Sequence, residues 1–225
     1  MEKYGTIPPR FTKAWWEYFW EYYKWHTIST VFVLVLVAVT AVQCATQTKY
    51  DLSLTYAGDA MLADETVDSI SAALSEVIAD CDGNDERNVF FQQLSLGSNM
   101  QNADPQYEMA MSTKLMLEFT AGESYIFIFS KEMLDTYLHR EDCESLFLPV
   151  SDWADTEPDK ESLALAGGVA YAVKLTDSTY LNSLGLNMEN QYLLVRAPRV
   201  SETDDERLMT QYESSLAAAN YLIAK

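Results

Sequence analysis

The sequence predicts an α/β protein in which an N-terminal transmembrane helix precedes a mostly parallel sheet flanked by helices. Three observations predict this. Residues 27–48 carry no charged side chain, and the segments after Lys49 alternate between strand-like and helix-like patterns. The segment "YIFIF" (125–129) is a short, wholly apolar strand of the kind buried in parallel sheets. A chain of 225 residues has room for one such domain and an anchor.

Residues 27–48 form the predicted transmembrane helix. As an α-helix they span roughly 33 Å, close to the ~30 Å hydrocarbon thickness of a bilayer. Val31–Val39 is purely apolar, so this segment lacks the polar face that the core helix of a soluble protein would need.

Two processing alternatives compete with an uncleaved anchor. "VTA" (Val39–Ala41) resembles a signal-peptidase site, but the region before it is long and carries three Glu. Cys44 follows "AVQ" as in a lipoprotein box, yet Gln43 stands where such boxes need a small residue. We therefore favour the uncleaved anchor.

Basic residues predict the orientation of the span. Four precede it: Lys3, Arg10, Lys13 and Lys24. Only Lys49 follows within twenty residues. By the positive-inside rule, residues 1–26 are cytoplasmic and residues 49–225 form an extracellular domain of a single-pass cell-membrane protein.

The segment before the span is rich in aromatic residues and predicts a juxtamembrane helix. On a helix, its charged residues fall in one narrow stripe and aromatic side chains cover the rest. Trp and Tyr favour the headgroup zone, which predicts a belt at the membrane interface. The alternative is a docking surface for another membrane protein, formed by Trp15, Trp16, Phe19, Trp20, Tyr23 and Trp25.

The predicted outer domain is strongly acidic. Residues 1–26 hold four Lys/Arg and three Glu, so the remainder of the chain holds eleven Lys/Arg against thirty-one Asp/Glu. This surface repels phosphate backbones, which excludes nucleic acid as a partner and disfavours anionic ligands. It either keeps the domain soluble or attracts cations and basic ligands.

The order of elements is read from hydrophobic periodicity and from capping residues. Strands are predicted at 50–56, 88–94, 125–129, 167–176 and 191–197. Helices are predicted from Asp64 to the break at "DCDGND", and at 106–121, 131–138, 178–184 and 203–222. Expected caps are Asp64, Ser130 and a Thr203–Glu206 capping box, and Gly122 is expected to end its helix. Beyond residue 140 the pattern weakens, residues 145–162 read as loop-rich, and Gly167–Gly168 read as a turn entering a strand.

No catalytic or metal-binding motif is present in the sequence. The two histidines, His26 and His139, are far apart and lie on opposite sides of the predicted membrane. His139 ends a predicted helix, where a positive group suits the helix dipole. The chain has no GxSxG, phosphate-loop or dinucleotide motif. We therefore expect no catalytic residue, no metal site and no cofactor.

Cys81 and Cys143 each follow a predicted helix and would share the oxidising outer compartment. Helices that return from parallel strands bring both of these ends toward the same edge of the sheet. A disulfide between the two is one alternative, and two unpaired thiols are the other.

The order "YDLSLTYAGD", "NVFFQQLSLGS" and "LMLEFTAGESYIFIFSKEMLDTYL" resembles the first lobe of type 2 extracytoplasmic solute-binding proteins. The late strands "GGVAYAVKL" and "QYLLVRAPR" look like the return portion of the same fold. The resemblance implies a bacterial, extracytoplasmic domain, and the compositional style of "FWEYYKWH" is similar to that of many small bacterial membrane proteins. About 175 residues are too few for two lobes, so we expect a reduced, single-lobe form.

In open parallel sheets, ligands bind beyond the carboxyl ends of the strands. The residues expected there are Tyr56, Gly58, Asp59, Ser95, Ser98, Ser130 and Lys131. Ordinary turn and capping chemistry is the alternative role for each of them. We expect a non-catalytic binding or interaction domain for a small non-anionic ligand. A scaffold subunit that docks through the aromatic helix is the first alternative, and an enzyme of the cell envelope is the second.

Overall fold

The computed structural model of the chain describes residues 9–45, 49–59, 61–96, 104–140, 142–184 and 188–224. The chain divides into two compact units, Met1–Thr48 and Lys49–Lys225, which we describe separately.

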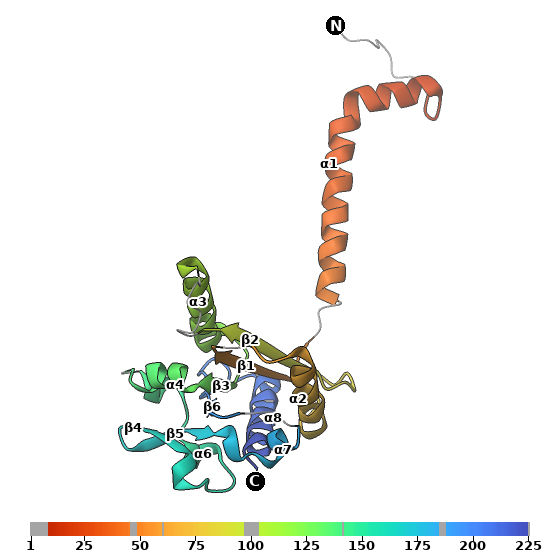
Figure 1. Cartoon of the computed structure of the whole chain (residues 1–225). Helices are drawn as coiled ribbons and strands as arrows, with labels where there is room; N and C mark the ends of the chain where they lie inside the picture. Colours follow the sequence, from red (N-terminus) through yellow and green to blue (C-terminus); the bar gives the residue numbers. More distant parts are fainter. Residues whose placement is uncertain are drawn as a thin grey trace. The chain divides into compact units, whose positions relative to one another are not determined.

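The first unit contains the helix α1 (Lys13–Ala45), which is bent along its length (Figure 1). Its apolar part is long enough to cross a membrane, with a mean hydropathy of 2.2 and no buried residue. The sequence predicted a separate aromatic helix ending at residue 26. The structure has one helix across that boundary, because neither Pro nor Gly interrupts Lys13–Ala45.

The second unit is built on a six-stranded sheet in the order β2-β1-β3-β6-β5-β4 (Figure 1). The strands are β1 (Leu52–Gly58), β2 (Val89–Ser95), β3 (Ile126–Ser130), β4 (Leu163–Ala166), β5 (Val169–Lys174) and β6 (Gln191–Val195). β1 pairs in parallel with β2 and β3, whereas the other three pairings are antiparallel. The sheet is therefore mixed, and the prediction of a mostly parallel sheet holds only for its β2-β1-β3 half.

The strand β4 was missed by the sequence analysis, which assigned no element to its residues. Four uniformly apolar residues, "LALA", carry no alternating pattern that would predict a strand. Gly167 and Gly168 have φ angles of 58° and 87°, so they form the tight turn of a β4-β5 hairpin. A hairpin joins antiparallel neighbours, which explains why this half of the sheet is not parallel.

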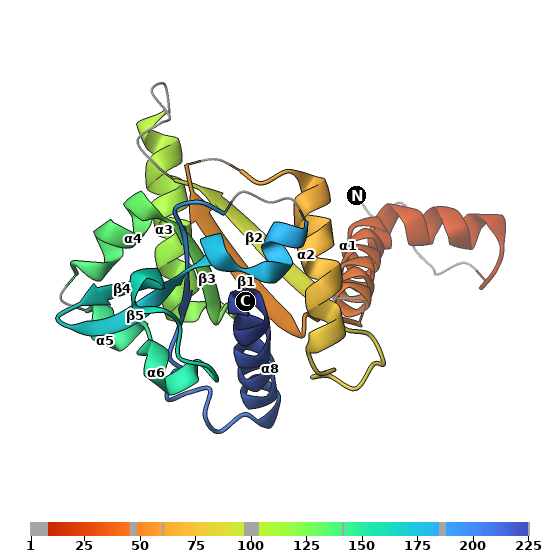
Figure 2. The same cartoon turned by 60° about the horizontal axis from the view of Figure 1, so that its bottom comes forward.

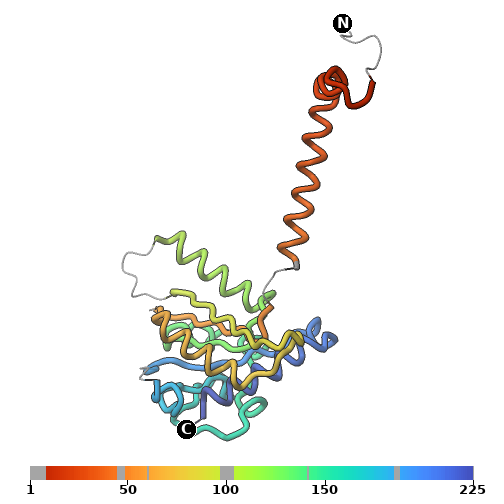
Figure 3. Tube along the Cα trace, turned by 90° about the vertical axis from the view of Figure 1, so that its right-hand side faces the viewer, coloured from red at the N-terminus to blue at the C-terminus, as the bar shows by residue number. Residues whose placement is uncertain are grey.

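Helices cover both faces of the sheet (Figures 2 and 3). α2 (Asp64–Val77) and α8 (Glu206–Ile223) pack on one face, and α3 (Pro105–Ala121) and α4 (Lys131–Leu138) pack on the other. The β1-α2-β2 and β2-α3-β3 crossovers run in opposite directions along the sheet. Because such crossovers are right-handed, their helices must lie on opposite faces.

Each face has its own apolar cluster. The α2/α8 side is mainly aliphatic, with Leu54, Ile70, Leu74 and Leu222 fully buried. The α3/α4 side is rich in aromatic rings. Phe119 lies at its centre, with ring centroids 4.7 to 6.3 Å from those of four neighbours: Phe127, Phe129, Tyr137 and Phe147. The segment predicted as loop adds three short helices: α5 (Cys143–Leu146), α6 (Val150–Trp153) and η1 (Lys160–Ser162).

Cys81 and Cys143 are both free thiols, so the structure has the unpaired alternative. Cys143 is buried in the aromatic cluster, whereas Cys81 lies on the opposite side, with its Sγ 3.8 Å from Oγ of Ser214 on α8. The expectation that both lie near one edge did not consider which face each helix covers. Burial raises the pKa of both thiols, which favours their protonated, unreactive form.

Two of the four predicted helix-end residues differ from the structure. Ser130 caps α4 and Gly122 ends α3, as predicted. At α2 the N-cap is Ala63, and Asp64 is the first helical residue. At α8 the N-cap is Asp205, whose carboxylate accepts bonds from the N–H groups of Arg207 and Leu208. The Thr203 hydroxyl donates instead to the Val200 carbonyl, so the predicted capping box is absent.

A buried ion pair connects the end of β6 to the segment before α8. The side chains of Arg196 and Glu202 are each 3% exposed and form two hydrogen bonds of 3.0 and 3.1 Å. Glu202 also accepts from Arg199, and Arg199 donates to the carbonyl of Gly122 at the end of α3. Burial raises the pKa of Glu202, but the bonds from Arg196 and Arg199 outweigh burial and hold this pKa below its usual value.

We expect Glu202→Ala to lower the free energy of unfolding of the 49–225 fragment by about 3–5 kcal/mol, because Arg196 would stay buried without its partner. Folding lowers the pKa of Glu202, so the ionised carboxylate stabilises the folded state fully above its unfolded-state pKa of about 4.3. This stabilisation is lost as the pH falls through the lower, folded-state pKa. The difference between variant and parent should therefore shrink in acid. Urea unfolding at pH 7 and pH 3 measures both effects. Asp204→Ala, in the same segment but exposed, is the control. Equal stability of the two variants would contradict the expectation.

Candidate functional site

The carboxyl ends of β1, β2 and β3 meet at one edge of the sheet, as the sequence predicted. Gly58 pairs with Ser95, and Ala57 pairs with Phe129, which places Ser130 next to Gly58. Ser98 lies outside the described residues. The structure thus brings together the strand ends that were expected to bind a ligand.

Packing in the core explains why Tyr56 and Gly58 stand at this edge. The Tyr56 hydroxyl lies against Gly58, where an added Cβ would be 2.5 Å from the oxygen, so a larger residue at position 58 would force the Tyr56 ring to shift. Tyr56 is 2% exposed. Burial and the nearby Asp59 carboxylate raise its pKa, while a hydrogen bond with Gln191 acts in the opposite direction. The Tyr56 side chain is therefore part of the core.

Ser130 and Lys131, at the same edge, have structural roles in helix capping and ion pairing. The Ser130 hydroxyl accepts a bond from the N–H of Met133, and Lys131 Nζ lies 2.7 Å from Asp135 Oδ1. Asp59 and Ser95 have interaction partners as well. The turn and capping roles are thus present, and ligand binding at this edge stays a prediction.

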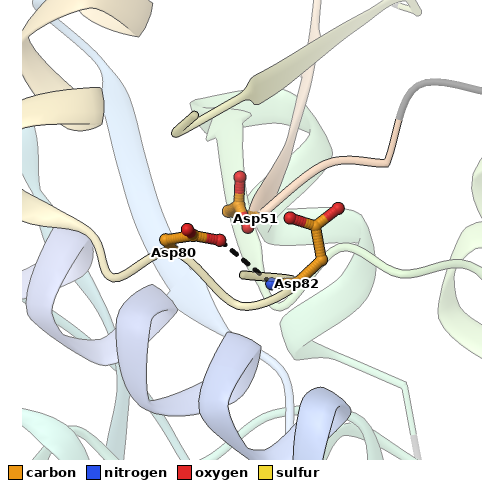
Figure 4. Close-up of side chains that lie close together, drawn as sticks. All are labelled: Asp51, Asp80 and Asp82. Carbon is orange, nitrogen blue, oxygen red and sulfur yellow. Dashed lines mark hydrogen bonds between the residues drawn. The ribbon is translucent and has the colours of Figure 1, made fainter. Parts of the chain in front are cut away.

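Three carboxylates meet at the opposite edge of the sheet, near the start of β1 (Figure 4). They belong to Asp51, just before β1, and to Asp80 and Asp82 in the segment between α2 and β2. One oxygen of each lies within 4.8 Å of the others. We call this group the Asp51 cluster.

Backbone N–H groups hold the Asp51 cluster together. Asp51 is 1% exposed, and its two oxygens accept 2.8 Å bonds from the N–H groups of Cys81 and Asn88. Asp80 accepts from the N–H groups of Gly83 and Asp85, both of which have positive φ. These bonds fold the 80–88 segment back onto β1.

The Asp51 cluster offers oxygen ligands of the kind that Ca²⁺ and Mg²⁺ prefer. The backbone N–H groups that donate to Asp51 and Asp80 already explain how this segment is folded. Slight burial raises the pKa of Asp80, but four backbone N–H groups lower it below its usual value. The sequence analysis predicted no metal site because the two histidines are far apart and no cluster of His, Cys or carboxylates with ligand spacing was recognised. The Asp80-x-Asp82 spacing was the available signal, whereas Asp51 lies 29 residues before Asp80 and could not be linked to it from sequence.

A second acidic region surrounds a cavity of about 400 Å³ at the C-terminal end of α8. We call it the α8 pocket. Its walls are the 155–159 loop, Ser162, the end of β5, the short helix η2 (Leu175–Asp177) with Ser178, and the end of α8. Four carboxylates line it: Asp155, Glu157, Asp159 and Asp177. Lys174 is the single basic residue among the described lining residues.

Side-chain hydrogen bonds fix the walls of the α8 pocket. The Asn220 side chain accepts from the N–H of Asp155 at 2.9 Å and donates to the carbonyl of Trp153 at 3.0 Å. It therefore ties the acidic loop to α8. Ser162 donates to Asp177 at 3.2 Å. Val173 on β5, 3% exposed, forms part of an apolar floor.

Of the predicted ligand-binding residues that the structure describes, none lines the α8 pocket. The sequence did contain one signal, because "DWADTEPDKE" holds five acidic residues within ten. That stretch was read only as loop. Its meeting with Asp177 and the end of α8 depends on tertiary structure.

The histidine of the second unit has a structural position. His139 is the C-cap of α4, with Nδ1 2.6 Å from the carbonyl oxygen of Asp135. This is the helix end where the sequence placed it.

No family model, no characterised protein and no solved structure matches this chain. We therefore infer function from the charge and geometry of the molecule.

We expect Asp51→Ala to lower the free energy of unfolding of the 49–225 fragment by about 2–4 kcal/mol, because two N–H groups would lose a charged acceptor. Asp82→Ala removes a carboxylate that accepts bonds from the backbone and side-chain N–H groups of the neighbouring Asn84, and should cost about 0.5 kcal/mol or less. Thermal or urea unfolding of both variants measures the contrast. A larger loss for Asp82→Ala would show that the cluster is held in some other way.

Proposed function

We propose that this protein is a single-pass membrane protein that holds an acidic, non-catalytic binding domain at the outer face of the membrane. The observation that carries the proposal is the contrast between the two units. The apolar part of α1 buries none of its residues, while the second unit closes two apolar clusters of its own. A helix this apolar is stable in lipid, and the domain does not need it as a core element.

The charge distribution supports an outward orientation. Four basic residues precede the apolar segment, and the acidic excess lies wholly after it. Basic flanks stay cytoplasmic during insertion. The bulk of the chain is then extracellular.

The domain binds a ligand without turning it over. The three sequence segments whose order resembles the first lobe of type 2 solute-binding proteins form the parallel β2-β1-β3 half of the sheet. The α8 pocket supplies a cavity within the 300–1,000 Å³ range of small-molecule sites. Its carboxylates favour a cationic or neutral ligand over an anion.

A scaffold role is the second candidate, favoured by the exposed aromatic side chains of α1. Trp16, Trp20 and Trp25 are 55%, 58% and 72% exposed. Rings of Trp15, Phe19 and Tyr23 stack on one another along the helix. Such a surface suits the headgroup zone and also suits a membrane partner.

Labelling of terminal tags on intact cells tests the orientation. We expect an epitope tag placed after Lys225 to bind antibody without permeabilisation, because the domain is outside. The matched control is the same tag before Met1, which should bind only after permeabilisation. The reverse pattern would place the domain in the cytoplasm and overturn the proposal.

Substitution of Trp16, Trp20 and Tyr23 by Ala tests the scaffold role. If the rings serve the interface zone alone, we expect the same set of co-purified membrane proteins as for the parent chain. The control replaces Val33, Val35 and Val37 by Ala, an equal number of changes in the span. A partner lost from the aromatic variant and kept by the control would favour the scaffold role over the binding role.

A further inference from the structure

We propose that the chain forms a two-fold symmetric dimer through the open edge of β2 and the exposed side of α3. We call this surface the β2/α3 face, and its exposed apolar side chains are Phe90, Tyr107, Met109, Met116 and Leu117. The occupant of the face is a second copy of the same chain. The inference goes beyond the proposed binding function, because it needs neither the α8 pocket nor any ligand.

The outer edge of β2 has backbone groups that no other strand of the domain bonds. β2 is the last strand on its side of the sheet. The N–H of Leu96, directly after β2, donates to the carbonyl of Gly58 on β1 at 2.7 Å. Residues 90, 92 and 94 face β1 in the same way, because backbone groups alternate in direction along a strand. The N–H groups of Val89, Phe91 and Gln93 therefore point outward, and they have no hydrogen-bond partner in the described part of the chain.

The strand β2 lacks the features that protect a free edge from pairing. Edge strands of natural proteins carry proline, charged side chains or β-bulges that prevent association. β2, "VFFQQLS", has no proline and no charged residue, and its seven residues pair with β1 without a register shift. The opposite edge strand, β4, has only four residues and a register shift between Ala164 and Leu165. β2 is therefore the edge that can accept another strand.

The exposed side of α3 is apolar, although this helix buries little in its own domain. The buried residues of α3 are Leu115 and Phe119, both in its C-terminal half, and residues 105–110 are all exposed. Figures 1 and 3 show the N-terminal end of α3 standing away from the sheet. Met109 and Leu117 are 72% and 57% exposed. Because helices in proteins gain most of their stability from packing, this side of α3 needs a cover.

Charge selects a second copy of the chain as that cover. The chain after residue 26 holds eleven Lys/Arg against thirty-one Asp/Glu, so two copies repel each other over most of their surface. The β2/α3 face is an exception. β2 is uncharged, and so is the exposed stripe of α3 at helical spacing, which consists of Met109, Thr113, Met116, Leu117 and Thr120. Two acidic copies can approach through such matching uncharged surfaces, whereas a cationic partner would be attracted to the acidic surface instead.

A two-fold axis through the middle of β2 covers the strand edge and the helix side together. Around this axis β2 pairs antiparallel with itself, with Phe91 opposite Phe91 of the second copy and Val89 opposite Gln93. The axis is perpendicular to the sheet, so both copies of α3 lie on the same face. A helix about 10 Å wide covers two strands about 4.8 Å apart, so the two helices come into contact when the strands pair. This interface is complete with two copies and leaves no β2 edge open for a third.

Light scattering of the full chain in dodecyl maltoside micelles measures the number of copies in each particle. We expect two copies of the parent chain at micromolar concentration. The double variant Met109→Glu and Leu117→Glu should be a single copy, because carboxylates of both chains would be buried at the interface without partners. The matched control is Leu165→Glu and Val200→Glu, which adds the same charge at side chains 59% and 88% exposed outside the face, and should stay dimeric.

Three outcomes of this measurement would overturn the proposal. A single copy of the parent chain would leave the β2/α3 face to a different partner. Dissociation of both variants would mean that added negative charge in general prevents association. Two copies in both variants would place the contact elsewhere, for example in α1.

Hydrogen exchange and a proline substitution test the strand pairing itself. Outward N–H groups of β2 are bonded only in the dimer, so their exchange should slow by about tenfold or more as the chain is concentrated. Val89→Pro removes one outward N–H at the first residue of β2, where proline is tolerated, and leaves the bonds to β1 intact. It should raise the dissociation constant of the dimer by about tenfold, because two symmetric bonds are lost. A dimer without added protection in residues 89–95, or one that Val89→Pro leaves equally tight, would contradict the pairing.

Discussion

The buried pair of Arg196 and Glu202 is the interaction on which the arrangement of the domain depends. Arg196 follows β6, and its Nε donates to the carbonyl of Ser124 just before β3. The guanidinium carbon lies 4.5 Å from the ring centroid of Tyr125. Glu202 stands four residues before α8. One pair thus ties the centre of the sheet to the helix that closes its aliphatic face, and the direction of α8 places the pocket at its far end.

Burying this pair costs desolvation energy, and the surroundings offset that cost. Glu202 accepts from both arginines and from a backbone N–H, so its charge is well solvated by donors. Burial and the charge of Glu202 together raise the pKa of Tyr125 to about 12, since Arg196 and Arg199 only partly oppose them. Tyr125 therefore stays neutral beside the pair. A charge this enclosed specifies one position for the 197–205 segment more sharply than apolar contacts would.

The acidic residues of the domain divide according to their partners. Glu202 is matched by arginine, and Asp51 is matched by backbone N–H groups, so both act in folding. The carboxylates of the α8 pocket line a cavity, and among them Asp177 accepts a hydrogen bond from Ser162. The same residue type therefore has different surroundings, depending on donors that come from distant parts of the chain.

The sequence by itself determined the apolar helix, the acidic balance and most elements, because periodicity and composition are local properties. Strand 125–129, helix 106–121 and the Ser130 cap needed only neighbouring residues. Tertiary structure alone decided the mixed sheet, the opposite faces of Cys81 and Cys143, and both groups of carboxylates. The strand β4 is defined by its pairing with β5, and the pocket by the meeting of the 155–159 loop with the end of α8. Such features depend on partners far away in the chain, and no local pattern encodes which distant segments meet.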